Sequence, residues 1–169
     1  MKGQSAKKTE TRVKIVQLAE FLKEAVYGQL DIALKDIDDA TLNWRPSPNS
    51  NSIGNLVVHI AGAESYWIHE VVGGMRVGRQ REREFNHVQF STNELLEEIR
   101  KIRNITDLVL EKLFDFNLED SRRYWSDRAR RDKETTVHWA ILHVIEHSAL
   151  HIGQIFYARK LYQSSKTGP

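Results

Sequence analysis

Apolar residues recur at helical spacing over most of this chain. From Thr11 to Lys35 they fall three or four positions apart, which predicts a first amphipathic helix. A loop rich in proline, asparagine and serine (43–52) follows, and it supplies Asn51 or Ser52 as the N-cap of a second helix over 53–72. A Gly-Gly pair then gives the C-cap signal that ends this helix.

The second half of the chain predicts two further helices. A polar crossover (75–90) shows no periodicity. Ser91, three residues before a glutamate, has the spacing of a capping box and opens a third helix to about Phe114. A second polar connection (115–134) leads to a last helix over 135–161. Neither connection shows the alternation that indicates a strand.

Amphipathic helices without a strand predict an all-α fold, a four-helix bundle. The two middle connections are longer than tight turns need. One of them is expected to cross the length of the bundle, so that the second and third helices run parallel in an up-down-down-up arrangement. A length of 169 residues fits a single domain over 1–169, with residues 1–9 as a frayed leader.

Composition excludes several kinds of chemistry. The chain has no cysteine, so disulfides, cysteine-ligated metals and a cysteine nucleophile are ruled out, and any thiol chemistry must use a thiol from outside the protein. No apolar run reaches the roughly 20 residues that span a bilayer, and no secretory signal follows the basic N-terminus, so we expect no membrane partner and a cytoplasmic location. The net charge is only +2, and acidic residues interrupt both arginine clusters (76–84 and 128–133), so we expect no nucleic-acid partner.

The stretch HVIEHSALHIGQ (143–154) carries His143, His147 and His151, each four residues after the last. They therefore lie along one stripe of the last helix. His59 lies on the apolar side of the second helix. If these helices are antiparallel, His59 is roughly 12 Å and His151 roughly 15 Å from the same end of the bundle. The imidazoles can then converge, although spacing alone does not choose between the His143/His147 and His147/His151 pairs.

Three converging neutral imidazoles suit a divalent first-row metal, zinc or nickel above all. Three ligands leave a coordination position open, which is typical of catalytic metal sites. The alternative is a set of core histidines satisfied by hydrogen bonds, but burying three in register without a ligand costs free energy. The other histidines, His69, His87 and His138, show no such pattern, and we assign them to the surface or to loops.

The motif SIGNLVVHIAGAESYW, followed by HVIEHSALHIGQI, resembles the DinB/YfiT-like (damage-inducible) family of helical bundle metalloproteins. The segments LNWRPSPNSNSI and GRQREREF (78–85) are also similar to parts of that family, and the resemblance covers about 42–161. It implies that His59, His147 and His151 are the metal ligands. It leaves His143 to support or pack against them.

The better understood members of this family are thiol-dependent transferases and isomerases that use thiols such as bacillithiol or mycothiol. The resemblance therefore implies a metal-dependent enzyme, a thiol S-transferase acting on a small-molecule substrate. Two alternatives use the same residues: a metal-dependent hydrolase with water as the nucleophile, and a non-enzymatic metal-binding stress module. The sequence identifies no catalytic residue. The glutamates that lie in the helices carrying the histidines, and so could transfer protons, are Glu64, Glu70 and Glu146. Glu146 directly precedes His147, so its side chain points about 100° away from that ligand.

Some further residues have two interpretations. Trp44, Tyr66 and Trp67 either line an apolar substrate pocket or pack in the core or at a dimer interface. Apolar surface on a bundle favours a homodimer. Gln154 either orients a histidine or packs across the bundle, and Gly153 indicates a close approach of another helix.

Overall fold

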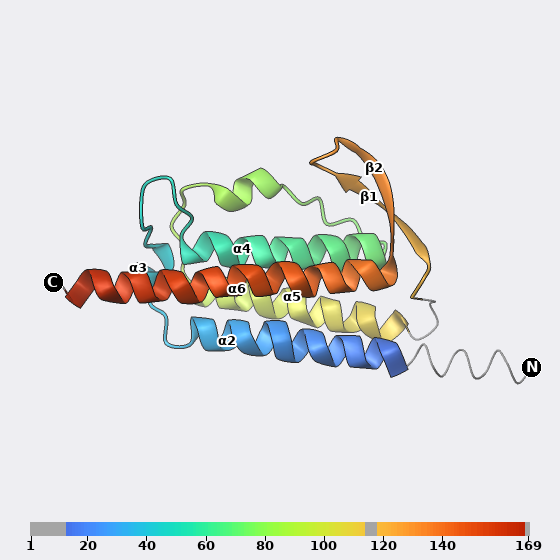
Figure 1. Ribbon diagram of the computed structural model, residues 1–169, viewed down its shortest axis with the longest axis horizontal. Coiled ribbons are helices and arrows are strands. Elements are labelled where there is room, and N and C mark those ends of the chain that lie inside the picture. The colour runs from blue at the N-terminus through green and yellow to red at the C-terminus, as the bar shows by residue number, and fades with distance from the viewer. Residues whose placement is uncertain (1–12, 114–117, 168–169) are drawn as a thin grey trace, which may run out of the picture.

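The computed structural model describes residues 13–113 and 118–167. Its long helices lie side by side along one axis, with an irregular segment and a small hairpin against one side of them (Figure 1). The predicted leader (1–9) lies outside the described residues. Within the described ranges, no helix is long and apolar enough to cross a membrane.

The first helix is continuous but consists of three segments. It is α-helical over 13–22, becomes the π-helix η1 (Lys23–Gly28) and ends as α2 (Gln29–Leu34). The chain then turns at Asp36, whose φ is 54°, and the short helix α3 (Asp39–Asn43) leads into the predicted loop. The predicted first helix is confirmed over the residues that the structure describes.

The second helix begins where the sequence predicts it. It consists of α4 (Ile53–Glu64), which continues as the π-helix η2 (Ser65–Val72). Ser52 is its N-cap: the Ser52 hydroxyl accepts a hydrogen bond from the Asn55 amide, and the Asn55 side chain accepts one from the Ser52 amide, both at 3.2 Å. The predicted Gly-Gly pair ends it, with Gly74 at a φ of 71° that glycine adopts without strain.

The long crossover fixes the order of the helices. Residues 75–90 return along α4 and carry the short 3-10 helix η3 (Arg81–Phe85), so that α5 (Thr92–Lys112) begins at the same end of the bundle as α4 (Figure 1). Helices α4 and α5 therefore run parallel, and α6 (Val137–Thr167) runs antiparallel to both. The predicted all-α bundle with an up-down-down-up order is confirmed.

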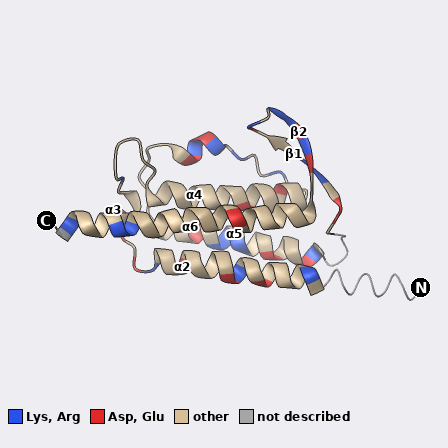
Figure 2. Ribbon diagram, in the orientation of Figure 1, with Lys and Arg blue, Asp and Glu red and all other residues tan. Residues whose placement is uncertain are grey.

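The second connection (115–134) differs from the prediction because it contains strands. Strand β1 (Ser121–Ser126) pairs antiparallel with β2 (Arg131–Thr136), with Ser121 opposite Thr136. The hairpin was missed because alternate positions of β1 are half-buried but occupied by arginine, tyrosine and serine, not by aliphatic residues. The first four positions of β2, Arg131 to Glu134, are exposed and charged, as Figure 2 shows.

The predicted capping box at Ser91 is also wrong. Ser91 is the N-cap of α5, but its side chain makes no capping hydrogen bond. The amide and the hydroxyl of Thr92 instead donate to Asp39 Oδ1 of α3, at 2.8 and 2.6 Å. A carboxylate at a helix N-terminus is a stronger acceptor than a serine hydroxyl, so a residue distant in sequence supplies the cap.

The apolar faces of the helices enclose one hydrophobic core. Leu22 of the first helix, Ile60 of α4 and Ile141 of α6 are among its fully buried side chains. Some apolar residues on the helical stripes of the first helix and of α5 are exposed instead of buried: Val13, Val16, Phe21 and Leu108. The apolar stripes of their helices are wider than the surface that neighbouring helices cover.

A polar network crosses this core. Glu64 Oε1 accepts hydrogen bonds from the Tyr27 hydroxyl at 2.7 Å and the Thr106 hydroxyl at 2.6 Å. His69 Nε2 lies 3.0 Å from the Thr106 hydroxyl, so His69 is a core residue with 2% exposure, and its predicted surface position is wrong. Burial raises the pKa of Glu64 and lowers the pKa of His69. Burial thus disfavours the charged form of each side chain.

We expect Ser52→Ala to lower the free energy of unfolding by about 1 kcal/mol, because it removes both side-chain contacts of the cap. Ser91→Ala is the matched control. It replaces an N-cap serine whose side chain makes no capping bond, and it should change stability little. Chemical denaturation of the two variants measures the difference. Equal losses would contradict the assignment of the caps.

Candidate metal centre

The structure brings three histidines together. His59 extends from α4, and His147 and His151 extend from α6, with one possible ligand atom of each within 4.8 Å of the others. His59 Nε2 and His147 Nε2 are 3.0 Å apart. Two nitrogens bound at 2.0–2.1 Å to one tetrahedral ion lie about 3.3 Å apart, so these two are close to the separation that shared coordination requires.

Hydrogen bonds fix the tautomers of two rings. His59 Nδ1 donates to Glu84 Oε2 at 2.7 Å, and His151 Nδ1 donates to Gln154 Oε1 at 2.9 Å. Carboxylate and amide oxygens only accept, so each ring carries its proton on Nδ1. The lone pairs on Nε2 are therefore free for an ion, and Gln154 has the orienting contact that was one of its two predicted roles.

Burial favours the neutral forms of His147 and His151. Burial, together with the neighbouring His151 and His59, lowers the pKa of His147 to about 3. Burial also lowers the pKa of His151. His147 Nδ1 is buried and has no hydrogen-bond partner among the described residues. Neutral imidazoles with convergent lone pairs are the donor set that zinc or nickel prefers, so the residues fit a divalent ion.

Glu84 is a site residue that the sequence did not reveal. It belongs to η3 of the crossover, is 6% exposed and bonds His59 Nδ1. Burial alone would raise its pKa, but hydrogen bonds from His59 and Arg79 hold the pKa below its ordinary value. Glu84 is therefore a carboxylate at neutral pH. A carboxylate on the far nitrogen of a metal-binding histidine orients the ring and raises its basicity.

Arg79 holds Glu84 in place. Its Nε donates to Glu84 Oε1 at 2.7 Å and its Nη2 donates to Glu84 Oε2 at 2.9 Å, in a two-pronged ion pair. The Arg79 side chain is only 14% exposed. Its Nη2 also lies 3.3 Å from His59 Nδ1, so the two donors share one carboxylate oxygen. Charge-assisted pairs of this geometry are among the strongest hydrogen bonds in proteins.

One face of α4 contacts the crossover segment around Glu84. Asn55, one turn before His59, donates to the main-chain oxygens of Glu84 at 2.8 Å and Asn86 at 3.0 Å. Gly62, on the next turn, leaves room for the carboxylate, because a Cβ there would lie 2.3 Å from Glu84 Oε1. Asn55, His59 and Gly62, at positions i, i+4 and i+7 of one helix face, thus form the surface against which Glu84 packs.

His143 lies outside the group of three. Its ring stacks on Trp139 at 4.8 Å and meets the edge of Trp67 at 5.0 Å. Trp67 is 8% exposed and also contacts Tyr124 of the hairpin, so it is a core aromatic, as one of its two predictions had it. Trp44 packs against Tyr162 at 5.6 Å.

The glutamates considered as proton-transfer groups are not in the histidine cluster. Glu64 belongs to the core network of Tyr27 and Thr106. Glu70 accepts a hydrogen bond from the Val77 amide at 3.2 Å. The Glu146 side chain is 70% exposed, in keeping with its predicted orientation.

The sequence matches a family model described as mycothiol S-transferase over residues 17–164. The chain belongs to this family. Mycothiol S-transferases are a DinB/YfiT-like family, so the resemblance drawn from the two histidine motifs is confirmed.

A structural comparison supports the fold independently. The crystal structure of a conserved protein from Enterococcus faecalis is similar to this chain, with a TM-score of 0.61 and 17% sequence identity. The match covers 86% of this chain and 94% of that one. At such low identity the likeness shows the fold alone. No curated protein matches the chain.

We expect Glu84→Gln to weaken zinc binding roughly 10- to 100-fold, because the amide cannot hold His59 as a carboxylate does. Competition with a chromophoric chelator measures the affinity. Glu82→Gln, in the same short helix and with the same change of charge, is the control and should bind zinc like the parent. Unchanged affinity in Glu84→Gln would show that Glu84 does not support a ligand.

The metal-free protein should lose stability as pH falls from about 6.5 toward 3. The pKa of His147 lies near 3 in the folded chain and near the ordinary histidine value of 6.5 in the unfolded chain. Below 6.5 the unfolded chain therefore binds protons that the folded chain does not, and unfolding is favoured. Above 6.5 both states are neutral and the effect vanishes.

Urea denaturation between pH 4.5 and 7.5 tests this pH dependence. His147→Ala should flatten the slope, whereas His87→Ala should leave it unchanged, because His87 is exposed on the crossover. His69→Ala cannot serve as the control, because His69 is buried and bonded to Thr106. The same slope in parent and His147→Ala would contradict the buried, neutral state of His147.

Proposed function

We propose that this protein is a divalent-metal-dependent thiol S-transferase, with His59, His147 and His151 as the metal ligands. The convergence of these imidazoles on one point supports the proposal most directly. Membership of the mycothiol S-transferase family supports the reaction type. The absence of cysteine means that the nucleophilic sulfur belongs to a second substrate, a low-molecular-weight thiol such as mycothiol or bacillithiol.

Zinc or nickel held there would lower the pKa of a bound thiol and so supply a thiolate near neutral pH. The chain contributes positioning. Glu84 and Gln154 hold the rings of His59 and His151 by their Nδ1 atoms, so that both Nε2 atoms face the same point. His59 is 3% exposed, whereas His147 and His151 are only half-buried, so the cluster can be reached from the α6 side.

The proposed transfer is a substitution at carbon and needs no oxidant or reductant. The thiol sulfur forms a bond to an electrophilic carbon of the second substrate. The bond from that carbon to its leaving group breaks, and the leaving group departs with the bonding pair. The thiol proton passes to solvent.

The predicted homodimer and cytoplasmic location are also part of the proposal. Large apolar side chains of α6 are exposed, among them Leu142, Leu150 and Tyr157, and they form the surface that a second copy would cover. The close approach of a helix expected at Gly153 is not made within the described residues, because a Cβ added there, on the same exposed face, meets nothing within 4 Å. Sedimentation equilibrium of the parent and Leu150→Glu tests the dimer.

The function is tested on protein purified without a metal-affinity tag. Elemental analysis should find one zinc or nickel per chain, and the loaded protein should accelerate the reaction of mycothiol or bacillithiol with an activated alkyl halide. Loss of free thiol measures the rate. His147→Ala should lose both metal and rate enhancement, and His87→Ala should keep both. A His147→Ala variant as active as the parent would falsify the proposal.

A further inference from the structure

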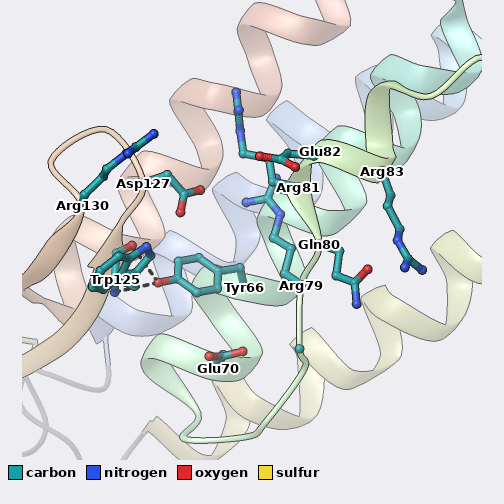
Figure 3. A pocket seen from close by; sticks show the side chains of 11 residues that line it. Tyr66, Glu70, Arg79, Gln80, Arg81, Glu82, Arg83, Trp125, Asp127 and Arg130 are labelled. Carbon is teal, nitrogen blue, oxygen red and sulfur yellow. Dashed lines mark hydrogen bonds between the residues drawn. The ribbon is translucent and has the colours of Figure 1, made fainter.

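A cavity lies between the crossover and the tip of the hairpin, beside the histidine cluster. Its volume is about 730 Å³, which suits a small organic molecule. Crossover residues 78–83 form one wall and Trp125, Asp127 and Arg130 of the hairpin form another, as Figure 3 shows, while Tyr66 and Glu70 of η2 lie between them. None of these residues belongs to the three-histidine group.

Guanidinium groups dominate the polar lining. Arg79, Arg81 and Arg83 follow one another along the crossover, and Arg130 lies across from them on the hairpin (Figure 3). Arg79 is paired with Glu84. Within the described part of the chain, Arg81, Arg83 and Arg130 have no carboxylate within the 4.0 Å of an ion pair. These arginines are available to bind a carboxylate from a ligand.

The acidic residues of the lining narrow the class of ligand. Glu70, Glu82 and Asp127 also face the cavity, so a ligand with negative charge alone would meet repulsion as well as attraction. A zwitterion, with a carboxylate for the arginines and an ammonium group for the carboxylates, satisfies both sets of charges.

The walls are held in place before a ligand arrives. The Tyr66 hydroxyl donates to the Trp125 carbonyl oxygen at 3.1 Å and accepts from the Trp125 amide at 2.9 Å, which ties the hairpin to η2. Trp125 is 52% exposed, so its indole offers an aromatic surface to a ligand. Arg130 has a φ of 49°, a left-handed conformation that suits glycine better than arginine. A formed cavity lowers the ordering cost of binding.

Arg79 belongs to both sites. It lines the cavity, and through Glu84 it holds His59. A ligand that contacts Arg79 in the cavity is therefore linked to His59 through the carboxylate of Glu84.

We propose that this cavity binds the carboxylate-bearing, zwitterionic part of the thiol substrate, with Arg81 and Arg130 as its carboxylate anchors; such a site selects a thiol like bacillithiol, which has carboxylates and a free amine, over mycothiol, which has neither. This inference rests on the proposed function for the identity of the ligand as the thiol. The binding of the zwitterion itself requires only the cavity.

The probe is S-methylglutathione, a zwitterion with carboxylates whose sulfur is blocked and cannot form a thiolate. The full-length, metal-loaded protein labelled with ¹⁵N is titrated by NMR, with the indole N–H of Trp125 as the local reporter. Binding should shift this resonance, and the dimethyl ester of the probe, which lacks the carboxylates, should bind about tenfold more weakly. Equal binding of the ester, or no binding at millimolar concentration, would overturn the proposal.

Matched variants locate the site. Arg130→Gln should weaken binding of S-methylglutathione about tenfold, whereas Arg128→Gln, in the same turn but outside the cavity, should not. Equal effects of the two would reveal only a general attraction to positive charge and would overturn the proposal.

His147→Ala separates this proposal from the metal site. The variant should still bind the probe even if it binds no metal, because the cavity does not include His147. Loss of probe binding in His147→Ala, with full binding in Arg130→Gln, would place the ligand on the histidines and overturn the cavity site. Retained probe binding in a chain that never binds metal would defeat the proposed function alone.

Discussion

The hydrogen bond between His59 and Glu84 is the contact on which the rest of the site depends. It joins the second helix to the crossover, and it fixes the tautomer that leaves His59 Nε2 free. Asn55 binds the main chain of the same segment one turn earlier, and Gly62 leaves space for the carboxylate one turn later. The crossover is therefore a structural part of the candidate metal centre as well as the link that makes α4 and α5 parallel. This explains why a polar segment without periodicity lies in an ordered position against the bundle.

Helical periodicity and cap signals were sufficient to predict the bundle, since each long helix has an apolar stripe that must be buried. The four-residue spacing of His147 and His151 placed them on one stripe, and the family resemblance selected them with His59. Glu84 could not be predicted from the sequence, because arginine and glutamate alternate through 81–84 and only the tertiary fold decides which carboxylate points inward. His69 was misplaced for a related reason, because its partner Thr106 lies on another helix. The hairpin was missed because a strand that lies on the surface of a bundle needs few aliphatic residues.

The candidate metal centre and the neighbouring cavity suit different kinds of ligand. The histidine cluster presents convergent imidazole nitrogens and suits an ion, while the cavity is lined by charged groups and suits a polar ligand. Arg79 and Glu84 connect the two, since the same ion pair forms part of the cavity wall and supports His59. A thiol anchored by its charged groups would thus be presented to the ion with little loss of freedom, which is how positioning accelerates a reaction between two substrates.

X-ray absorption at the zinc edge, on protein loaded with one equivalent of zinc, tests the central claim most directly. We expect a shell of about three imidazole nitrogens at about 2.0–2.1 Å with one further light-atom ligand, and a sulfur neighbour at about 2.3 Å after a low-molecular-weight thiol is added. An oxygen-rich shell without imidazole scattering, or a spectrum that the thiol leaves unchanged, would contradict it.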